Sequence, residues 1–261
     1  MSESLFAQER RGAREGSGET LVLLHGFGGD HTAWFSIVQR LPKEWRVLSY
    51  DLPGHGRSLN VPGAGRAGAM AKAVLADLEA RGIERFRLAG HSMGGAVATM
   101  MAMRAPERIA ALTLLAPGGY GPEIAIDVLR DWGAAAARPS IAKALARMTA
   151  PGHRFGAFEI SRVEAMRRRR GQVPVLREIA ASMADENGHQ GAFPSEHLAK
   201  LPGGSTLVWG DADPILPFAQ AERAPDNLVR IDLPAAGHML MEERPAEVAN
   251  AIRSTSTTWS S

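Results

Sequence analysis

The stretch that decides the fold is Gly90-His91-Ser92-Met93-Gly94, which lies between an apolar run and an Ala- and Met-rich segment. Residues 86–90 have the composition of a buried strand, and residues 93–105 that of a buried helix. A serine flanked by small residues at such a junction is typical of a tight strand-to-helix turn that lifts the hydroxyl above a sheet. A glycine-rich turn with an incidental serine would explain the five residues but not their flanks. We therefore predict an α/β fold with Ser92 at the end of a strand.

Short apolar runs alternate with helical segments on both sides of this turn, which predicts a mostly parallel central sheet flanked by helices. The expected strands are residues 20–25, 46–51, 86–90, 110–116, 205–210 and 228–233. The expected helices are residues 32–41, 67–81, 93–105, 217–223 and 245–253.

One long stretch, rich in Ala and Arg, breaks this alternation and has the pattern of several short helices. Ligands of open α/β sheets bind beyond the carboxyl ends of the strands, where such an insertion can cover them. We predict that residues 1–118 and 203–261 form an α/β core and that residues 119–202 form an inserted helical cap.

The composition excludes several classes of protein. The 261 residues are 45% hydrophobic and 22% charged, as expected for one globular domain. There is no cysteine, which excludes a disulfide framework, a thiolate metal site and a cysteine nucleophile. The N-terminus has no basic segment followed by an apolar run, and no stretch approaches 18 uncharged apolar residues. We expect a soluble, cytoplasmic protein without membrane partners, either a monomer or a homodimer.

The charges nearly cancel, with 30 Lys and Arg against 28 Asp and Glu, so the net charge of +2 indicates no polyanion partner. The densest basic run is Arg167-Arg168-Arg169-Arg170. It has two interpretations: a patch that binds nucleic acid, or the solvated face of a helix in an arginine-rich chain. We favour the solvated face and expect no nucleic-acid partner.

A serine hydroxyl is a weak nucleophile at neutral pH, so Ser92 requires a base and a group that orients the base. Two carboxylates, Asp211 and Asp213, follow the strand expected over residues 205–210. We select Asp213 as the orienting acid and keep Asp211 as the alternative. His238, in a Gly-His loop before the final helix, is the candidate base. Alone it would be interpreted as a surface histidine, but the order serine, acid, histidine favours a catalytic triad.

The tetrahedral intermediate of acyl transfer carries an oxyanion, which needs backbone donors already in place. His25-Gly26-Phe27-Gly28-Gly29 follows the first strong strand, and we expect one donor from the amide of Phe27 and the second from that of Met93. A flexible glycine loop without catalytic duty is the alternative. We expect an apolar substrate pocket that is lined, besides Phe27 and Met93, by Gly26, Trp34, Phe155, Phe158, Phe193, Leu216 and Met239.

A further turn, Asp51-Leu52-Pro53-Gly54-His55-Gly56-Arg57-Ser58, follows another expected strand. His55 or Arg57 could be interpreted as catalytic. Because His238 is the better candidate for the base, we predict a structural role for this turn.

Taken together, HGFGG, DLPGHGRS, GHSMGG, WGDADPILP and AGHM resemble the α/β-hydrolase superfamily in order and spacing over nearly the whole length. The resemblance implies Ser92, Asp213 and His238 as the triad. The stretches HGFGGDHTAW, LSYDLPGHGRS and LLAPGGYGPEI are similar to the hydrolase-like domain of the dihydrolipoamide acetyltransferase component of acetoin dehydrogenase. A serine at the nucleophile position argues against haloalkane dehalogenases and epoxide hydrolases, which place an aspartate there.

From these residues we expect a serine hydrolase that cleaves a carboxylic ester or a related acyl bond, such as a thioester or lactone, through an acyl-enzyme. Carbon–carbon bond hydrolysis stays open. The expected partner is a small-molecule acyl substrate, and the chemistry requires no metal and no organic cofactor. Two alternatives are an acyltransferase that passes its acyl group to a lipoyl or coenzyme A thiol, and a non-catalytic ligand-binding or complex-associated module.

Overall fold

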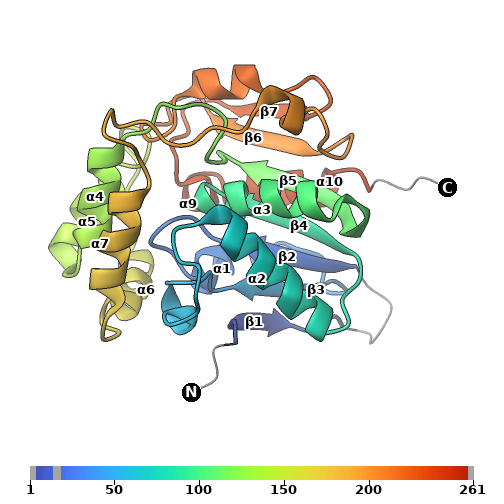
Figure 1. Cartoon of the computed structure of the whole chain (residues 1–261). Helices are drawn as coiled ribbons and strands as arrows, with labels where there is room; N and C mark the ends of the chain where they lie inside the picture. The colour runs from blue at the N-terminus through green and yellow to red at the C-terminus, as the bar shows by residue number, and fades with distance from the viewer. Residues whose placement is uncertain (1–3, 14–18, 258–261) are drawn as a thin grey trace.

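The computed structural model describes residues 4–13 and 19–257, and a seven-stranded sheet forms the centre of this part of the chain (Figure 1). The strand order is β1-β3-β2-β4-β5-β6-β7, and all neighbouring pairs are parallel except β1 with β3. The strands are β1 (Ala7–Arg10), β2 (Thr20–Leu24), β3 (Arg46–Tyr50), β4 (Phe86–His91), β5 (Ile109–Leu115), β6 (Thr206–Gly210) and β7 (Val229–Leu233). The predicted α/β fold and its six parallel strands are therefore confirmed.

Strand β1 was not predicted. Its sequence, Ala-Gln-Glu-Arg, is polar, yet it pairs antiparallel with β3, with Ala7 opposite Tyr50 and Arg10 opposite Val47. An edge strand does not need an apolar face, and charged side chains there oppose pairing with other molecules. The apolar pattern that reveals a buried strand is therefore missing from β1.

Helices cover both faces of the sheet. Helices α2 (Ala67–Ala80) and α3 (Met93–Arg104) pack together on one face, and α1 (Phe35–Val38) and α10 (Pro245–Ser254) pack together on the other. The helix expected over 32–41 is shorter, because it consists of the 3₁₀ turn η1 (His31–Trp34) followed by α1. The helix expected over 217–223 is the 3₁₀ segment η4 (Phe218–Arg223). The remaining short elements of this part are η2 (Gly56–Ser58), η3 (Pro106–Arg108) and α9 (Leu240–Glu243).

A group of helices lies between β5 and β6 in the chain. They are α4 (Ile126–Ala134), α5 (Arg138–Ala146), α6 (Ala157–Arg167), α7 (Gln172–Ser182) and α8 (Ser195–Leu198). Figure 1 shows α4, α5, α6 and α7, here named the cap helices, gathered beside the sheet. They lie at the carboxyl ends of the parallel strands, since they share cavity walls with the loops that follow β2, β4 and β7.

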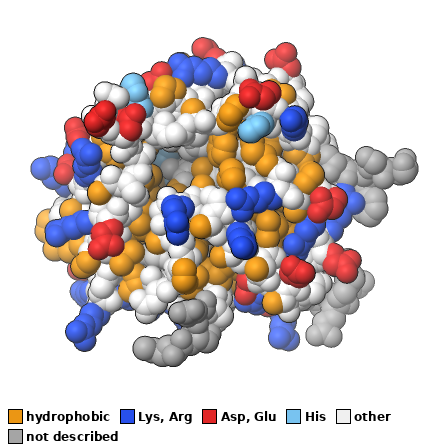
Figure 2. All heavy atoms as spheres, viewed as in Figure 1, with side chains coloured by type: hydrophobic (Ala, Val, Ile, Leu, Met, Phe, Trp, Pro, Cys, Tyr) orange, Lys and Arg blue, Asp and Glu red, His pale blue; other side chains and the backbone are white. Residues whose placement is uncertain are grey.

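The surface in Figure 2 carries positive and negative side chains interspersed with apolar ones. In residues 4–13 and 19–257, no helix has both the length and the apolar character that crossing a bilayer requires.

Candidate active site

Ser92 occupies a strained turn between β4 and α3. Its φ of 52° and ψ of −116° lie in a region that non-glycine residues rarely adopt. The turn also brings backbones into close contact. A Cβ atom on Gly90 would lie 2.3 Å from the carbonyl oxygen of Gly94, and one on Gly94 would lie 2.3 Å from that of Leu24. The glycines on both sides of the serine are thus required by the space available, and the predicted strand-to-helix turn is present.

Three loops bring Ser92, His238 and Asp213 into one hydrogen-bonded chain. The Nε2 atom of His238 lies 2.9 Å from Oγ of Ser92, and its Nδ1 atom lies 2.8 Å from Oδ2 of Asp213. All three side chains are buried. Because a carboxylate only accepts, Nδ1 carries the proton, and Nε2 is left free to accept the serine proton.

The backbone decides between the two candidate acids. Oδ1 of Asp213 accepts from the amides of Ile215 and Leu216, at 2.8 and 3.0 Å, which leaves Oδ2 for the imidazole. Asp211 instead accepts from the amide of Ala235 at 2.7 Å and is exposed. Asp213 therefore contacts His238, whereas Asp211 binds the backbone of the loop after β7.

Two residues that the sequence analysis missed hold the loop of His238. His91, directly before the serine, donates from Nε2 to the carbonyl oxygen of His238 at 2.8 Å. The buried carboxylate of Glu243 accepts from the amides of Gly237 and Ala150 at 2.9 Å each. It thereby ties the histidine loop to the segment after cap helix α5. His91 lies inside the motif Gly90-His91-Ser92-Met93-Gly94, so its place next to Ser92 could have indicated a role at the site. Nothing in the sequence around Glu243 indicates its contacts with the histidine loop.

The amides expected to bind the oxyanion are free to do so. Within the described chain neither the amide of Phe27 nor that of Met93 donates a hydrogen bond. Met93 is the first residue of α3, where the helix dipole also favours negative charge. Phe27 lines the same cavity as Ser92. Both predicted donors are thus available beside the serine.

The cap helices hold the Phe27 loop from outside. Trp132 donates from Nε1 to the carbonyl oxygen of Phe27, and Arg167 donates from Nη1 to that of Gly28, each at 2.9 Å. Arg167 also donates to the carbonyl oxygen of Ala135 and lies over the indole ring of Trp132. Burial lowers the pKa of this guanidinium to about 9. The interpretation of the arginine run as a solvated face is therefore wrong for Arg167, which is 4% exposed.

His55 holds the same loop from the core side. Its Nε2 atom accepts from the amide of Gly28 at 3.1 Å, and its Nδ1 atom lies 3.1 Å from the carbonyl oxygen of Pro53. Arg57 donates its amide to Asp51 and stacks on Phe6. Neither takes part in the chain that ends at Ser92, as expected for a structural turn.

Asp30, His31 and Asp51 bring possible metal ligands within 4.8 Å of one another. Both carboxylate oxygens of Asp51 already accept hydrogen bonds, from His31 and from the amide of Arg57, and Oδ1 of Asp30 accepts from Thr32. The cluster is explained as a hydrogen-bonded junction between two loops.

Two cavities meet at Ser92. The first, of about 40 Å³, lies under cap helix α6 and is also lined by His238 and Phe27. The second, of about 260 Å³, lies between the cap helices and α3 and is lined by Met93 and Leu216. Of the other residues expected in the pocket, Gly26, Phe155 and Met239 line the first cavity.

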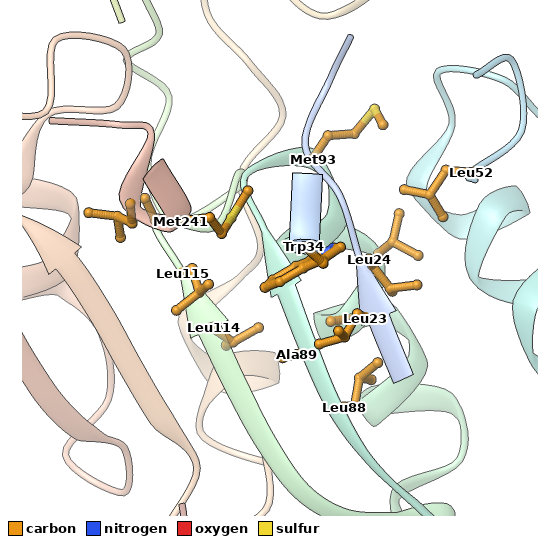
Figure 3. Packing of buried hydrophobic residues seen from close by; sticks show 14 of the residues in the cluster. Leu23, Leu24, Trp34, Leu52, Leu88, Ala89, Met93, Leu114, Leu115 and Met241 are labelled. Carbon is orange, nitrogen blue, oxygen red and sulfur yellow. The ribbon is translucent and has the colours of Figure 1, made fainter. Parts of the chain in front are cut away.

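Three aromatic residues expected in the pocket lie elsewhere. Trp34 is fully buried and packs in the core among Leu24, Met241 and their neighbours (Figure 3). Phe158 is 56% exposed and packs on Phe35 outside both cavities. Phe193 contacts Tyr120 beyond the cavity walls. An aromatic side chain indicates burial or contact, but the sequence does not show towards which cavity or neighbour the side chain points.

Buried histidines predict an acid-sensitive fold. Burial lowers the pKa of His55 and of His91 to about 3, and also lowers that of His25. The unfolded chain therefore binds more protons between pH 3 and 6.5, so stability is lost as the pH falls through this range. His31 and Glu242 act oppositely, because their pKa values are raised, but they are outnumbered.

We expect the melting temperature to rise between pH 4 and pH 6.5, and the slope to become shallower in a His91→Asn variant. Differential scanning calorimetry over this range measures both. A flat profile for the wild type would contradict the burial of neutral histidines.

Comparison with known proteins agrees with this geometry. The model of the Alpha/beta hydrolase family matches residues 21–251. The acetyltransferase component of the acetoin cleaving system (dihydrolipoyllysine-residue acetyltransferase) of Pseudomonas putida is 36% identical over 88% of this chain and 61% of its own length. The protein of the same name from Cupriavidus necator is 31% identical over 90% of this chain and 63% of its length. The chain thus spans about three fifths of these relatives.

Among solved structures, a thermophilic esterase from Thermogutta terrifontis is 25% identical, with a TM-score of 0.73 over 95% of this chain and 91% of the esterase. The fold, the family model and the long matches to curated relatives all indicate the same family. The chain belongs to the α/β-hydrolase family and is an enzyme of the serine α/β-hydrolase kind.

Proposed function

We propose that this enzyme hydrolyses a carboxylic ester or a related acyl bond, such as a thioester or lactone, with Ser92, His238 and Asp213 as its triad. The observation that carries the proposal is the unbroken chain of two hydrogen bonds, 2.8 and 2.9 Å long, from Asp213 to His238 to Ser92. Free amides of Phe27 and Met93 beside the serine support it.

The first half-reaction forms an acyl-enzyme. Ser92 Oγ attacks the carbonyl carbon while Nε2 of His238 takes the hydroxyl proton, and Asp213 stabilises the imidazolium. The carbonyl oxygen becomes negative opposite the amides of Phe27 and Met93. When the intermediate collapses, the bond to the leaving oxygen breaks and His238 returns the proton to that oxygen. Water then repeats the sequence, releasing the acid and Ser92.

A second candidate is acyl transfer to a thiol. The names of the two long matches, acetyltransferase components of an acetoin cleaving system, favour it. In that reaction a lipoyl or coenzyme A thiol, rather than water, attacks the acyl-enzyme.

A fluorophosphonate probe tests the shared chemistry. We expect stoichiometric labelling of Ser92, turnover of short activated esters, and product formation that does not depend on an added thiol. Dependence on dihydrolipoamide or coenzyme A would replace hydrolysis by acyl transfer. Absence of labelling in the folded protein would leave the non-catalytic module as the explanation.

We also propose that residues 119–202 act as a cap over the core formed by residues 1–118 and 203–261. The contacts of Trp132 and Arg167 with the Phe27 loop support this division. A small-molecule acyl substrate is the expected partner, and sedimentation would distinguish a monomer from a homodimer.

A further inference from the structure

The two cavities at Ser92 differ in whether His238, the proposed base, lines them. His238 lines the first cavity, together with Met239 and Met241, whereas the described walls of the second include Ser92 and Met93 but not His238. The base must reach the leaving oxygen in order to return a proton to it. The alcohol part of an ester therefore belongs in the first cavity, and the acyl part in the second.

The first cavity contains an ion pair at its wall. Nη2 of Arg162, on cap helix α6, lies 3.2 Å from Oε1 of Glu242, which is on α9 four residues after the base. Nη1 of Arg162 donates to Oγ1 of Thr32. The two charged side chains are only 13% and 9% exposed. A buried ion pair contributes little net stability, so its place in the cavity that Ser92 and His238 also line is consistent with recognition of a polar group.

One atom of this pair is unsatisfied. Oε2 of Glu242 is buried and has no hydrogen-bond partner in the described chain. Burial raises the pKa of this carboxyl to about 7, against the opposing effect of Arg162. Glu159 lines the same cavity and adds negative charge. A ligand hydroxyl can donate to the carboxylate or accept from the carboxylic acid, whereas a ligand carboxylate would face two acidic side chains.

The walls of the two cavities complete the assignment. The wall of the first cavity is largely apolar but includes the polar side chains of Glu159, Arg162 and Glu242. The second cavity, of about 260 Å³, has Ala96, Met183 and Leu216 among its walls. The first cavity thus offers polar partners to the alcohol part of an ester, and the second offers apolar contacts to the acyl part.

We infer that the enzyme prefers a monoester of a small polyol, with a free hydroxyl of the alcohol part paired to Glu242 and Arg162 and the acyl chain in the second cavity. The inference rests on the proposed function and narrows its substrate. The acyl group passes from the polyol oxygen to Oγ of Ser92, and the serine proton goes through His238 to the polyol. Water then attacks the acyl-enzyme, which releases the carboxylic acid and restores the Ser92 hydroxyl.

Two esters with the same acyl group test this directly: the butanoyl monoester of glycerol and the butanoyl ester of 1-propanol. We expect wild-type kcat/KM to be about tenfold or more higher for the glycerol ester, since a hydrogen bond to a charged group is among the stronger ones. Glu242→Gln and Arg162→Met should each bring the ratio of the two kcat/KM values close to one. Arg168→Met is the matched control, because Arg168 directly follows α6 but its side chain is 72% exposed and pairs, among the residues that the structure describes, with Glu164. It should keep the wild-type ratio.

A wild-type ratio near one overturns the inference without any variant, as does a ratio that Glu242→Gln and Arg162→Met leave unchanged. If a variant does not fold, inhibition of the wild type by glycerol but not by 1-propanol supports the inference, and equal inhibition opposes it. Failure of the proposed function has a different signature, since neither ester would be cleaved and a fluorophosphonate would not label Ser92.

Discussion

Ser92→Ala is expected to lower kcat by about 10⁵-fold or more while the protein stays folded. Removal of Oγ removes the atom that forms the acyl-enzyme, and neither His238 nor Asp213 can replace it. Stopped assays with an activated ester measure the rate, and circular dichroism checks the fold. A Ser92→Ala variant with a rate comparable to wild type would falsify the assignment of the nucleophile.

The same position offers an internal control on strain. Ser92→Gly should be equally inactive, yet about 1 kcal/mol more stable than Ser92→Ala, because glycine tolerates a φ of 52° that alanine does not. Urea unfolding of the two variants compares them. Equal midpoints would mean that the turn stores no strain at this residue.

Asp213→Asn is expected to lower kcat by about 10⁴-fold with little change in the fold. The amides of Ile215 and Leu216 require an acceptor, so the asparagine oxygen faces them and its NH₂ group faces the imidazole. Nδ1 of His238 must then accept, which moves the ring proton to Nε2, where the serine proton should go.

Asp211→Asn is the matched control for this prediction. Asp211 lies two residues away and contacts Ala235 rather than His238, so kcat should stay within a few-fold of wild type. If the two variants lose activity equally, the base is not oriented by Asp213 in the way that the structure indicates.

The sequence predicted those parts of the fold whose physical origin is local. Apolar runs revealed the six parallel strands, and the small residues around Ser92 revealed the turn. Strand β1 was not predicted, because an edge strand can be polar. The helix expected over 32–41 begins as a 3₁₀ turn and ends at Val38, three residues earlier than expected.

The site was predictable where chain order carries the information. The order of serine, acid and histidine predicted the three residues of the proposed triad. Which of Asp211 and Asp213 faces His238 depends on the backbone amides that hold each carboxylate. Contacts between distant segments had no sequence signal. Arg167 looks like any residue of a basic run, and only the packing of α6 against the Phe27 loop shows that it is buried.

The bonds from Trp132 and Arg167 to the Phe27 loop bear on timing within the turnover cycle. An outward swing of the cap helices would withdraw both donors from the carbonyl oxygens of Phe27 and Gly28. Substrate would then enter in one arrangement of the cap helices, and its bond would be cleaved in another. In that open arrangement the amide of Phe27 would lose two contacts that position its loop, so we expect bond cleavage to be slower until the helices return.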